Sequence, residues 1–79
     1  MRVTVKFFAS VREVVGSRSQ EVDLPDGATL ADLWQTYVEK YPRLGNLALA
    51  YAVNHEYSGL QRVLKDGDEV AFIPPVSGG

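Results

Sequence analysis

The chain has 79 residues, of which 46% are hydrophobic and 23% charged, a composition typical of one small globular domain. A chain of this length buries only about 60% of the surface that it exposes when unfolded, which leaves little material for a substrate pocket. It has no cysteine and a single histidine, His55, which excludes disulfides, a thiol nucleophile and cysteine-based zinc sites. The net charge of −2 provides no excess of basic residues to neutralise phosphates, so we do not expect nucleic acid as a partner. We therefore expect no free-standing catalysis.

The beginning of the chain shows no targeting signal. Met1 to Lys6 alternate between apolar and polar residues and lack the apolar stretch of a signal peptide. No segment approaches the roughly 18 apolar residues that a membrane span needs. We therefore expect a cytoplasmic protein that does not bind a membrane.

The first quarter of the chain predicts two strands joined by a short helix. Residues 2–8 alternate with a period of two, as in a half-buried strand. Residues 10–13 resemble a capping box and Gly16 suits a C-terminal cap, so a short helix is expected between them. Residues 20–24 alternate again, and we expect them to pair with the first strand as an antiparallel hairpin.

The main helix is predicted after the turn at residues 25–27. Thr29 is expected to cap it, with Asp32 near its positive end, and Pro42 is expected to end it. Apolar residues recur at the spacing of one helical face. They are Leu30, Leu33, Trp34, Tyr37, Val38 and Tyr41.

The second half of the chain predicts two more strands and allows a short additional strand between them. Residues 43–48 are expected to form a loop, residues 49–53 a strand with its turn at residues 54–56, and residues 69–73 the last strand. Between these strands, Leu60, Val63 and Leu64 are expected to contribute buried side chains.

One helix on one face of a small mixed sheet is an α+β arrangement. A long crossover between two hairpins would place the first and last strands at the centre of the sheet and parallel to each other. The order of elements therefore predicts the ubiquitin-like β-grasp fold over residues 1–73, followed by an extended C-terminal tail over residues 74–79 that ends in Gly-Gly.

Three apolar residues fall on the sheet face that the helix would leave uncovered. Phe8 follows Phe7 directly, and in the last strand Ala71 and Ile73 alternate with the residues expected in the core. If the two strands are neighbours, Phe8, Ala71 and Ile73 form an exposed apolar patch, which is typical of a partner surface. The alternative is that the strand ends place these residues under a loop.

The tail is the most informative segment of the chain. Pro74 and Pro75 cannot continue a sheet and hold the chain extended. Gly78 and Gly79 have no side chain, so this backbone can pass through a channel too narrow for a Cβ atom. Such a tail is suited to delivering the terminal carboxylate into the active site of another protein.

The remaining polar residues favour ordinary structural roles. His55 lies between Asn54 and Glu56 and is interpreted as a solvated turn residue, because no partner that could orient it as a base is evident. The acidic run at residues 66–69 lacks the spacing of a calcium loop and predicts a turn. We expect no metal site.

The tail and two segments near the start and middle of the chain together resemble a known family. Residues 64–79 closely resemble the end of the MoaD-type sulfur carriers, the small subunits of molybdopterin synthase. Phe7-Phe8-Ala9, followed by residues 11–13 and Gly16, matches the opening of that family, and residues 52–54 also fit. The segments that match least are residues 43–48 and 55–63.

The resemblance implies that the reactive group is the C-terminus itself. An E1-like enzyme would adenylate the carboxylate of Gly79 with ATP and magnesium, and sulfur from a sulfurtransferase would convert it to a thiocarboxylate. The synthase large subunit would then receive the tail, and the sulfur would attack cyclic pyranopterin monophosphate in molybdenum cofactor biosynthesis. No cofactor would be bound permanently.

The resemblance also assigns candidate site residues. Gly79 would carry the sulfur. The tail inserted into the partner's active site would comprise Val76, Ser77, Gly78 and Gly79. Contacts with the large subunit and the activating enzyme would be made by Phe8, Arg12, Ala71, Ile73 and Pro75.

Three other functions remain open. The chain could carry sulfur for thiamine thiazole synthesis, although the paired prolines Pro74 and Pro75 argue against that family. It could be a ubiquitin-related modifier whose C-terminus forms an amide with lysines of other proteins. From a different class, it could be an interaction module with an inert tail.

Overall fold

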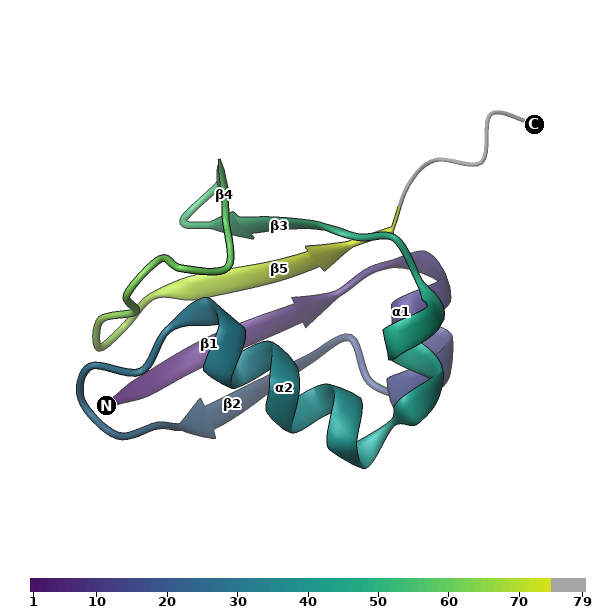
Figure 1. Ribbon diagram of the computed structural model, residues 1–79, viewed down its shortest axis with the longest axis horizontal. Helices are drawn as coiled ribbons and strands as arrows, with labels where there is room; N and C mark the ends of the chain where they lie inside the picture. Colours follow the sequence, from purple (N-terminus) through teal and green to yellow (C-terminus); the bar gives the residue numbers. More distant parts are fainter. Residues whose placement is uncertain (75–79) are drawn as a thin grey trace.

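The computed structural model describes residues 1–74 (Figure 1). These residues form five strands, two α-helices and one 3₁₀ helix. The elements are β1 (Arg2–Phe7), α1 (Ala9–Val15), β2 (Ser19–Asp23), α2 (Leu30–Lys40), η1 (Pro42–Asn46), β3 (Ala50–Val53), β4 (Glu56–Ser58) and β5 (Glu69–Ile73).

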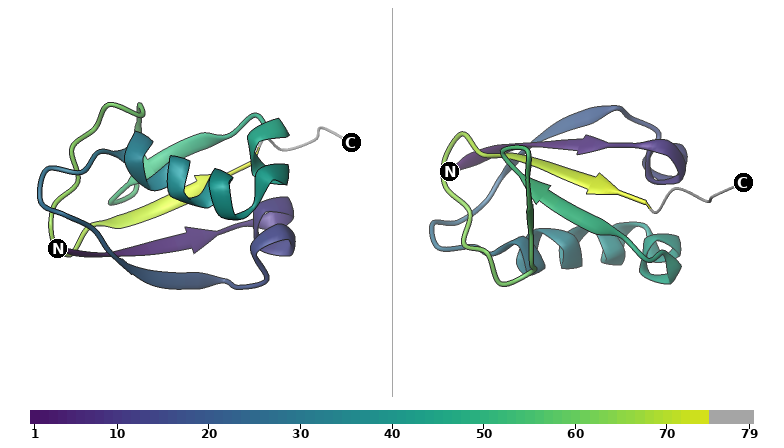
Figure 2. Two further views of the ribbon diagram at one scale, coloured as in Figure 1. Left: turned by 60° about the horizontal axis from the view of Figure 1, so that its bottom comes forward. Right: turned by 90° about the horizontal axis from the view of Figure 1, so that it is seen from above.

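The five strands form one mixed sheet in the order β2-β1-β5-β3-β4. β1 and β5 lie side by side at its centre and run parallel, whereas the other neighbouring strands are antiparallel. Helix α2 crosses one face of the sheet, and α1 and η1 lie together at the end where β1 and β5 finish (Figures 1 and 2). This arrangement confirms the predicted ubiquitin-like β-grasp fold, with both terminal strands central and parallel.

Helix α2 begins where the sequence predicts. Thr29 accepts a hydrogen bond from the backbone N–H of Asp32 through Oγ1 at 3.2 Å, and Asp32 accepts one from the backbone N–H of Thr29 at 2.9 Å. This reciprocal pair is a complete capping box. From this start, Leu30, Leu33 and Tyr37 are directed into the core.

The core lies between α2 and the sheet face that the helix covers. β1 and β5 supply alternate residues to it, so that Val5, Val70 and Phe72 have no exposed surface. The ring of Phe72 packs edge-on against Trp34 and Tyr37 of the helix, with centroid distances of 5.0 and 5.7 Å. Successive side chains of a strand point to opposite faces of the sheet. The residues of β1 and β5 that alternate with these core residues therefore point to the face that α2 does not cover.

Helix α1 begins differently from the prediction. The expected capping box at residues 10–13 is wrong: the helix starts at Ala9, and Phe8 occupies the cap position without a side-chain hydrogen bond. The carbonyl of Phe8 accepts hydrogen bonds from the backbone N–H groups of Val11 and Arg12, and Ala9 has a φ of +47°. A sharp backbone turn at Ala9 therefore starts the helix directly after β1, which leaves no room for a cap at Ser10. The predicted C-terminal cap is confirmed, because Gly16 adopts a φ of +82°.

Two further expectations differ from the structure. Part of the segment predicted as a loop at residues 43–48 belongs to η1, whose Leu44 is fully buried; five residues are too few to show a helical period. The sequence predicts that Val63 is buried, yet about half of its surface is exposed. Its backbone pairs with Thr29 as an isolated bridge, so Val63 contributes through its main chain.

Candidate functional site

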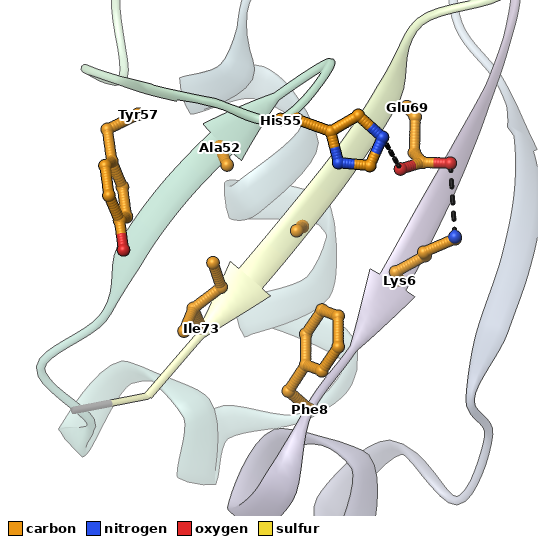
Figure 3. A pocket seen from close by; sticks show the side chains of 8 residues that line it. Lys6, Phe8, Ala52, His55, Tyr57, Glu69 and Ile73 are labelled. Carbon is orange, nitrogen blue, oxygen red and sulfur yellow. Dashed lines mark ion pairs between the residues drawn. The ribbon is translucent and has the colours of Figure 1, made fainter. Parts of the chain in front are cut away.

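The uncovered face of the sheet carries a groove over β1, β5 and β3 (Figure 3). In the register of the central strands, Lys6 of β1 lies opposite Ala71 of β5, and Ala52 of β3 lies on the other side of Ala71. All three side chains therefore share this face. We call the cavity, of about 280 Å³, the sheet groove. Its lining consists of Lys6, Phe8, Ala52, His55, Tyr57, Glu69, Ala71 and Ile73.

The structure brings together the three apolar residues that the strand periodicity placed on this face. Phe8, Ala71 and Ile73 all line the sheet groove. Phe8 is the most exposed of them, with 44% of its surface accessible. Phe8 is exposed and Ala71 and Ile73 line the groove without being fully buried, so among the described residues no loop buries them, contrary to the alternative. Their role as partner contacts stays a prediction.

A charged row borders the sheet groove that sequence reasoning did not find. Glu69 lies between two basic groups: its Oε1 is 3.2 Å from Nζ of Lys6, and its Oε2 is 3.3 Å from Nε2 of His55. Figure 3 shows these three side chains reaching toward one another from β1, β5 and the β3–β4 turn. His55 is largely exposed, as predicted for a turn residue, but it also belongs to this row. No local signal could reveal it, because the row exists only once β1 and β5 are neighbours.

The turn between β3 and β4 positions His55 at the edge of the groove. Asn54 and His55 both adopt positive φ angles, +51° and +70°, which suit a two-residue hairpin turn and which asparagine and histidine adopt more readily than most other non-glycine residues. The amide of Asn54 anchors the turn, because Nδ2 donates to Asp68 and Oδ1 accepts from the backbone N–H of Glu69, each at 2.9 Å. The same amide therefore holds the start of β5 and the rim of the groove in register.

Arg12, a predicted partner contact, does not line the sheet groove. It lies in α1, which follows β1. It is an exposed residue of α1, and it lines a second cavity of about 290 Å³. We call this cavity the basic groove. Its lining consists of Lys6, Phe7, Phe8, Arg12, Arg18 and Ser19. Phe8 and Lys6 belong to both grooves, so the two cavities adjoin.

The predicted tail begins at the sheet groove, since Ile73 at the end of β5 lines it and Pro74 follows. The predicted contact Pro75 and the predicted tail residues Val76, Ser77, Gly78 and Gly79 lie outside the described residues. Their roles stay predictions from the sequence.

Within residues 1–74, no three His, Asp or Glu side chains cluster closely enough to hold a metal ion. In the same part of the chain, every helix is too short or too polar to cross a membrane. An apolar centre, a charged row and a basic groove adjoin at the place where the tail begins, and such a surface can bind a partner.

The chain is similar, over nearly its whole length, to a known protein family and to several known proteins. The model of the ThiS family matches residues 5–79. A molybdopterin synthase sulfur carrier subunit from Chlamydomonas reinhardtii is 43% identical, with 100% of both chains covered. Among solved structures, SAMP1 from Haloferax volcanii has a TM-score of 0.87 and 32% identity over 100% of both chains. A chain in the complex of subunits 1 and 2 of the molybdopterin-converting factor from Helicobacter pylori has a TM-score of 0.71 and 27% identity, again with both chains fully covered.

Proposed function

Because this chain belongs to the ThiS family, we propose that it is the sulfur carrier subunit of a molybdopterin synthase. The observation that carries the proposal is the 43% identity, over the full length of both chains, to a relative of that name. The tail of the sequence also supports the proposal, because Gly78-Gly79 follow the paired prolines Pro74 and Pro75, as expected of a carrier that delivers its C-terminus.

The proposed chemistry takes place at the carboxylate of Gly79. An E1-like enzyme activates this carboxylate with ATP and magnesium, so that the acyl carbon becomes electrophilic and pyrophosphate is released. The terminal sulfur of a sulfurtransferase persulfide attacks this carbon and AMP leaves, which gives an acyl disulfide. A thiol then reduces the S–S bond, so that the thiocarboxylate is released and the sulfurtransferase cysteine ends in a disulfide with that thiol. The sulfur of the thiocarboxylate then attacks cyclic pyranopterin monophosphate in the large subunit, and water hydrolyses the resulting thioester, so that the sulfur stays on the substrate and Gly79 leaves as a carboxylate.

The geometry supports a division of labour between the chain and its partners. The described residues supply two adjoining docking surfaces, and in this proposal the catalytic groups for the sulfur transfer belong to the partners. The sheet groove lies at the base of the tail. A partner bound there through Phe8, Ala71 and Ile73, and in the adjoining basic groove through Arg12, would have the tail next to its own active site. The Helicobacter pylori complex of subunits 1 and 2 supports a large subunit as this partner.

The carrier role is tested by intact-mass spectrometry after the chain is incubated with the activating enzyme, ATP, magnesium and a sulfur donor. We expect a mass increase equal to the exchange of one oxygen for sulfur, located on Gly79. A variant that lacks Gly79 is the matched control, and it should remain unmodified while melting at the same temperature. A chain that shows only carboxylate under these conditions, or a control that becomes equally modified, would contradict the carrier role.

A second function is favoured by the similarity to SAMP1, a small archaeal modifier protein. The same activated C-terminus could form an amide with a lysine of another protein. Mass spectrometry of tryptic peptides from cells that express the chain separates the two roles. Lysines modified through the C-terminal Gly79 support the modifier role, whereas a free thiocarboxylate with no modified lysines supports the carrier alone.

A further inference from the structure

Charge is distributed unevenly along the molecule, although the whole chain has a net charge of −2. β1 and β5 finish at the end that also carries α1 and η1 (Figure 1). Basic residues outnumber acidic ones at this end: Arg12, Arg18, Lys40 and Arg43 lie here with Glu13 and Glu39. The opposite end holds the N-terminus and the turns before α2 and β5, and acidic residues dominate there. They include Asp23, Asp26, Asp32, Asp66 and Asp68.

The basic groove concentrates this positive charge beside Phe8. Its three basic side chains come from β1, α1 and the segment before β2, and no acidic side chain lines it. The backbone holds Arg18 in place, because its carbonyl accepts a hydrogen bond from the N–H of Phe7 at 2.9 Å. Three segments separated in sequence therefore direct basic groups to one cavity.

The charge of the basic groove is only partly neutralised within the chain. Lys6 is paired with Glu69. Within residues 1–74, neither Arg12 nor Arg18 lies within 4.0 Å of a carboxylate. Guanidinium groups bind carboxylates with two parallel hydrogen bonds, and they do so better than ammonium groups. The two arginines are therefore available to an acidic group from outside the described residues.

We propose that the basic groove binds a carboxylate-bearing segment of the synthase large subunit and steers that subunit onto the end of the molecule where the tail begins. The inference rests on the carrier role proposed above. Charge complementarity selects the occupant, because a basic end on an otherwise acidic molecule attracts an acidic surface and repels a basic one. Phe8 lies in both grooves, so this contact is continuous with the apolar docking surface.

The test measures association of the chain with its large subunit by stopped-flow fluorescence at low and high salt. The double variant Arg12→Glu/Arg18→Glu should associate about 10- to 100-fold more slowly at low salt. This deficit should shrink at high salt, because salt screens exposed charges over about 10 Å at 0.1 M. The variant Arg12→Lys/Arg18→Lys retains the charge and should recover most of the rate.

Arg62→Glu/Lys65→Glu is the matched control. It makes the same change in net charge with exposed residues near the opposite end of the molecule, and it should alter the rate by less than about 3-fold. Melting temperatures of all variants establish that they are folded.

The outcomes separate this inference from the carrier role. If the native chain does not bind the large subunit and receives no sulfur, the carrier role fails. If the native chain binds but Arg12→Glu/Arg18→Glu associates equally fast, or faster, then the large subunit presents no acidic surface to the basic groove and the inference is wrong. An equal loss in the control variant would also overturn it, because net charge alone would then explain the effect.

Discussion

Tyr37 shows how one side chain connects the helix to the sheet. It is almost fully buried, and its ring packs edge-on against Phe7 at a centroid distance of 5.3 Å. Its hydroxyl donates a hydrogen bond to Oε1 of Gln20 on β2 at 2.8 Å. Burial, together with the nearby Tyr41, raises the pKa of Tyr37 to about 12. The folded protein therefore accommodates the neutral phenol and disfavours the phenolate.

The raised pKa of Tyr37 predicts a loss of stability at high pH. In the unfolded chain a tyrosine ionises near pH 10, so the contribution of Tyr37 is fully present below pH 10 and is lost as the pH rises toward about 12. The loss is expected to be about 2 kcal/mol. Urea unfolding of the native chain and of Tyr37→Phe, between pH 8 and pH 12, measures it. The native chain should lose more stability than the variant across this range; parallel curves would show that Tyr37 does not titrate as proposed.

At the scale of the element, β5 shows one strand that supplies two surfaces. Val70 and Phe72 are fully buried under α2, whereas Ala71 and Ile73 line the sheet groove. A strand alternates with a period of two, so a slip of one residue would exchange the two sets. The hydrogen bonds of Asn54 to Asp68 and to the backbone of Glu69 hold the start of β5 against such a slip.

The apolar residues that line the sheet groove, Phe8, Ala71 and Ile73, should contribute to the affinity for the partner and little to the stability of the fold. We expect Phe8→Asp and Ile73→Asp each to weaken binding of the large subunit by at least about 10-fold, since charge at an apolar contact is costly to bury. Their melting temperatures should stay close to that of the native chain. Isothermal titration calorimetry and thermal unfolding measure the two effects. Val63→Asp changes a half-exposed apolar residue outside both grooves, and binding should be retained. A large fall in melting temperature for Phe8→Asp would place Phe8 in the core instead.

At the scale of the whole molecule, a cluster of aromatic rings joins the sheet to the helix. Phe72, on the central strand β5, contacts the rings of Phe7, Trp34, Tyr37 and Tyr51. These residues come from two other strands and from α2, so the packing of Phe72 depends on the complete fold. For a chain of this length the total stability is typically about 4–12 kcal/mol.

Two phenylalanines that lie on different faces provide a direct comparison. Phe72→Ala should cost about 3–5 kcal/mol, a large share of the total, because Phe72 is fully buried. Phe8→Ala should cost less than about 1 kcal/mol, because Phe8 is 44% exposed. Guanidinium chloride unfolding measures both. Similar losses for the two variants would contradict the assignment of one residue to the core and the other to the surface.

Features that depend on neighbours along the chain were predictable. The alternation of residues 2–8, the cap at Thr29 and the glycine cap at Gly16 all depend on contacts within a few residues. The prediction failed where a local signal competed with a backbone turn, as at Ser10, or where the segment was too short to show a period, as in η1. Phe8, Ala71 and Ile73 could be assigned to one face because strand periodicity determines the direction of each side chain.

By itself, the sequence determined the types of most elements, the inner and outer faces of the central strands, and the Gly-Gly end of the chain. Only the tertiary structure decided which groups meet: Lys6 with Glu69 and His55 in the sheet groove, and Lys6 with Arg12 and Arg18 in the basic groove. The physical reason is that side-chain direction within a helix or strand follows from local backbone geometry. Contact between residues more than sixty positions apart, as between Lys6 and Glu69, depends instead on the parallel pairing of β1 with β5, which the whole chain must fold to form.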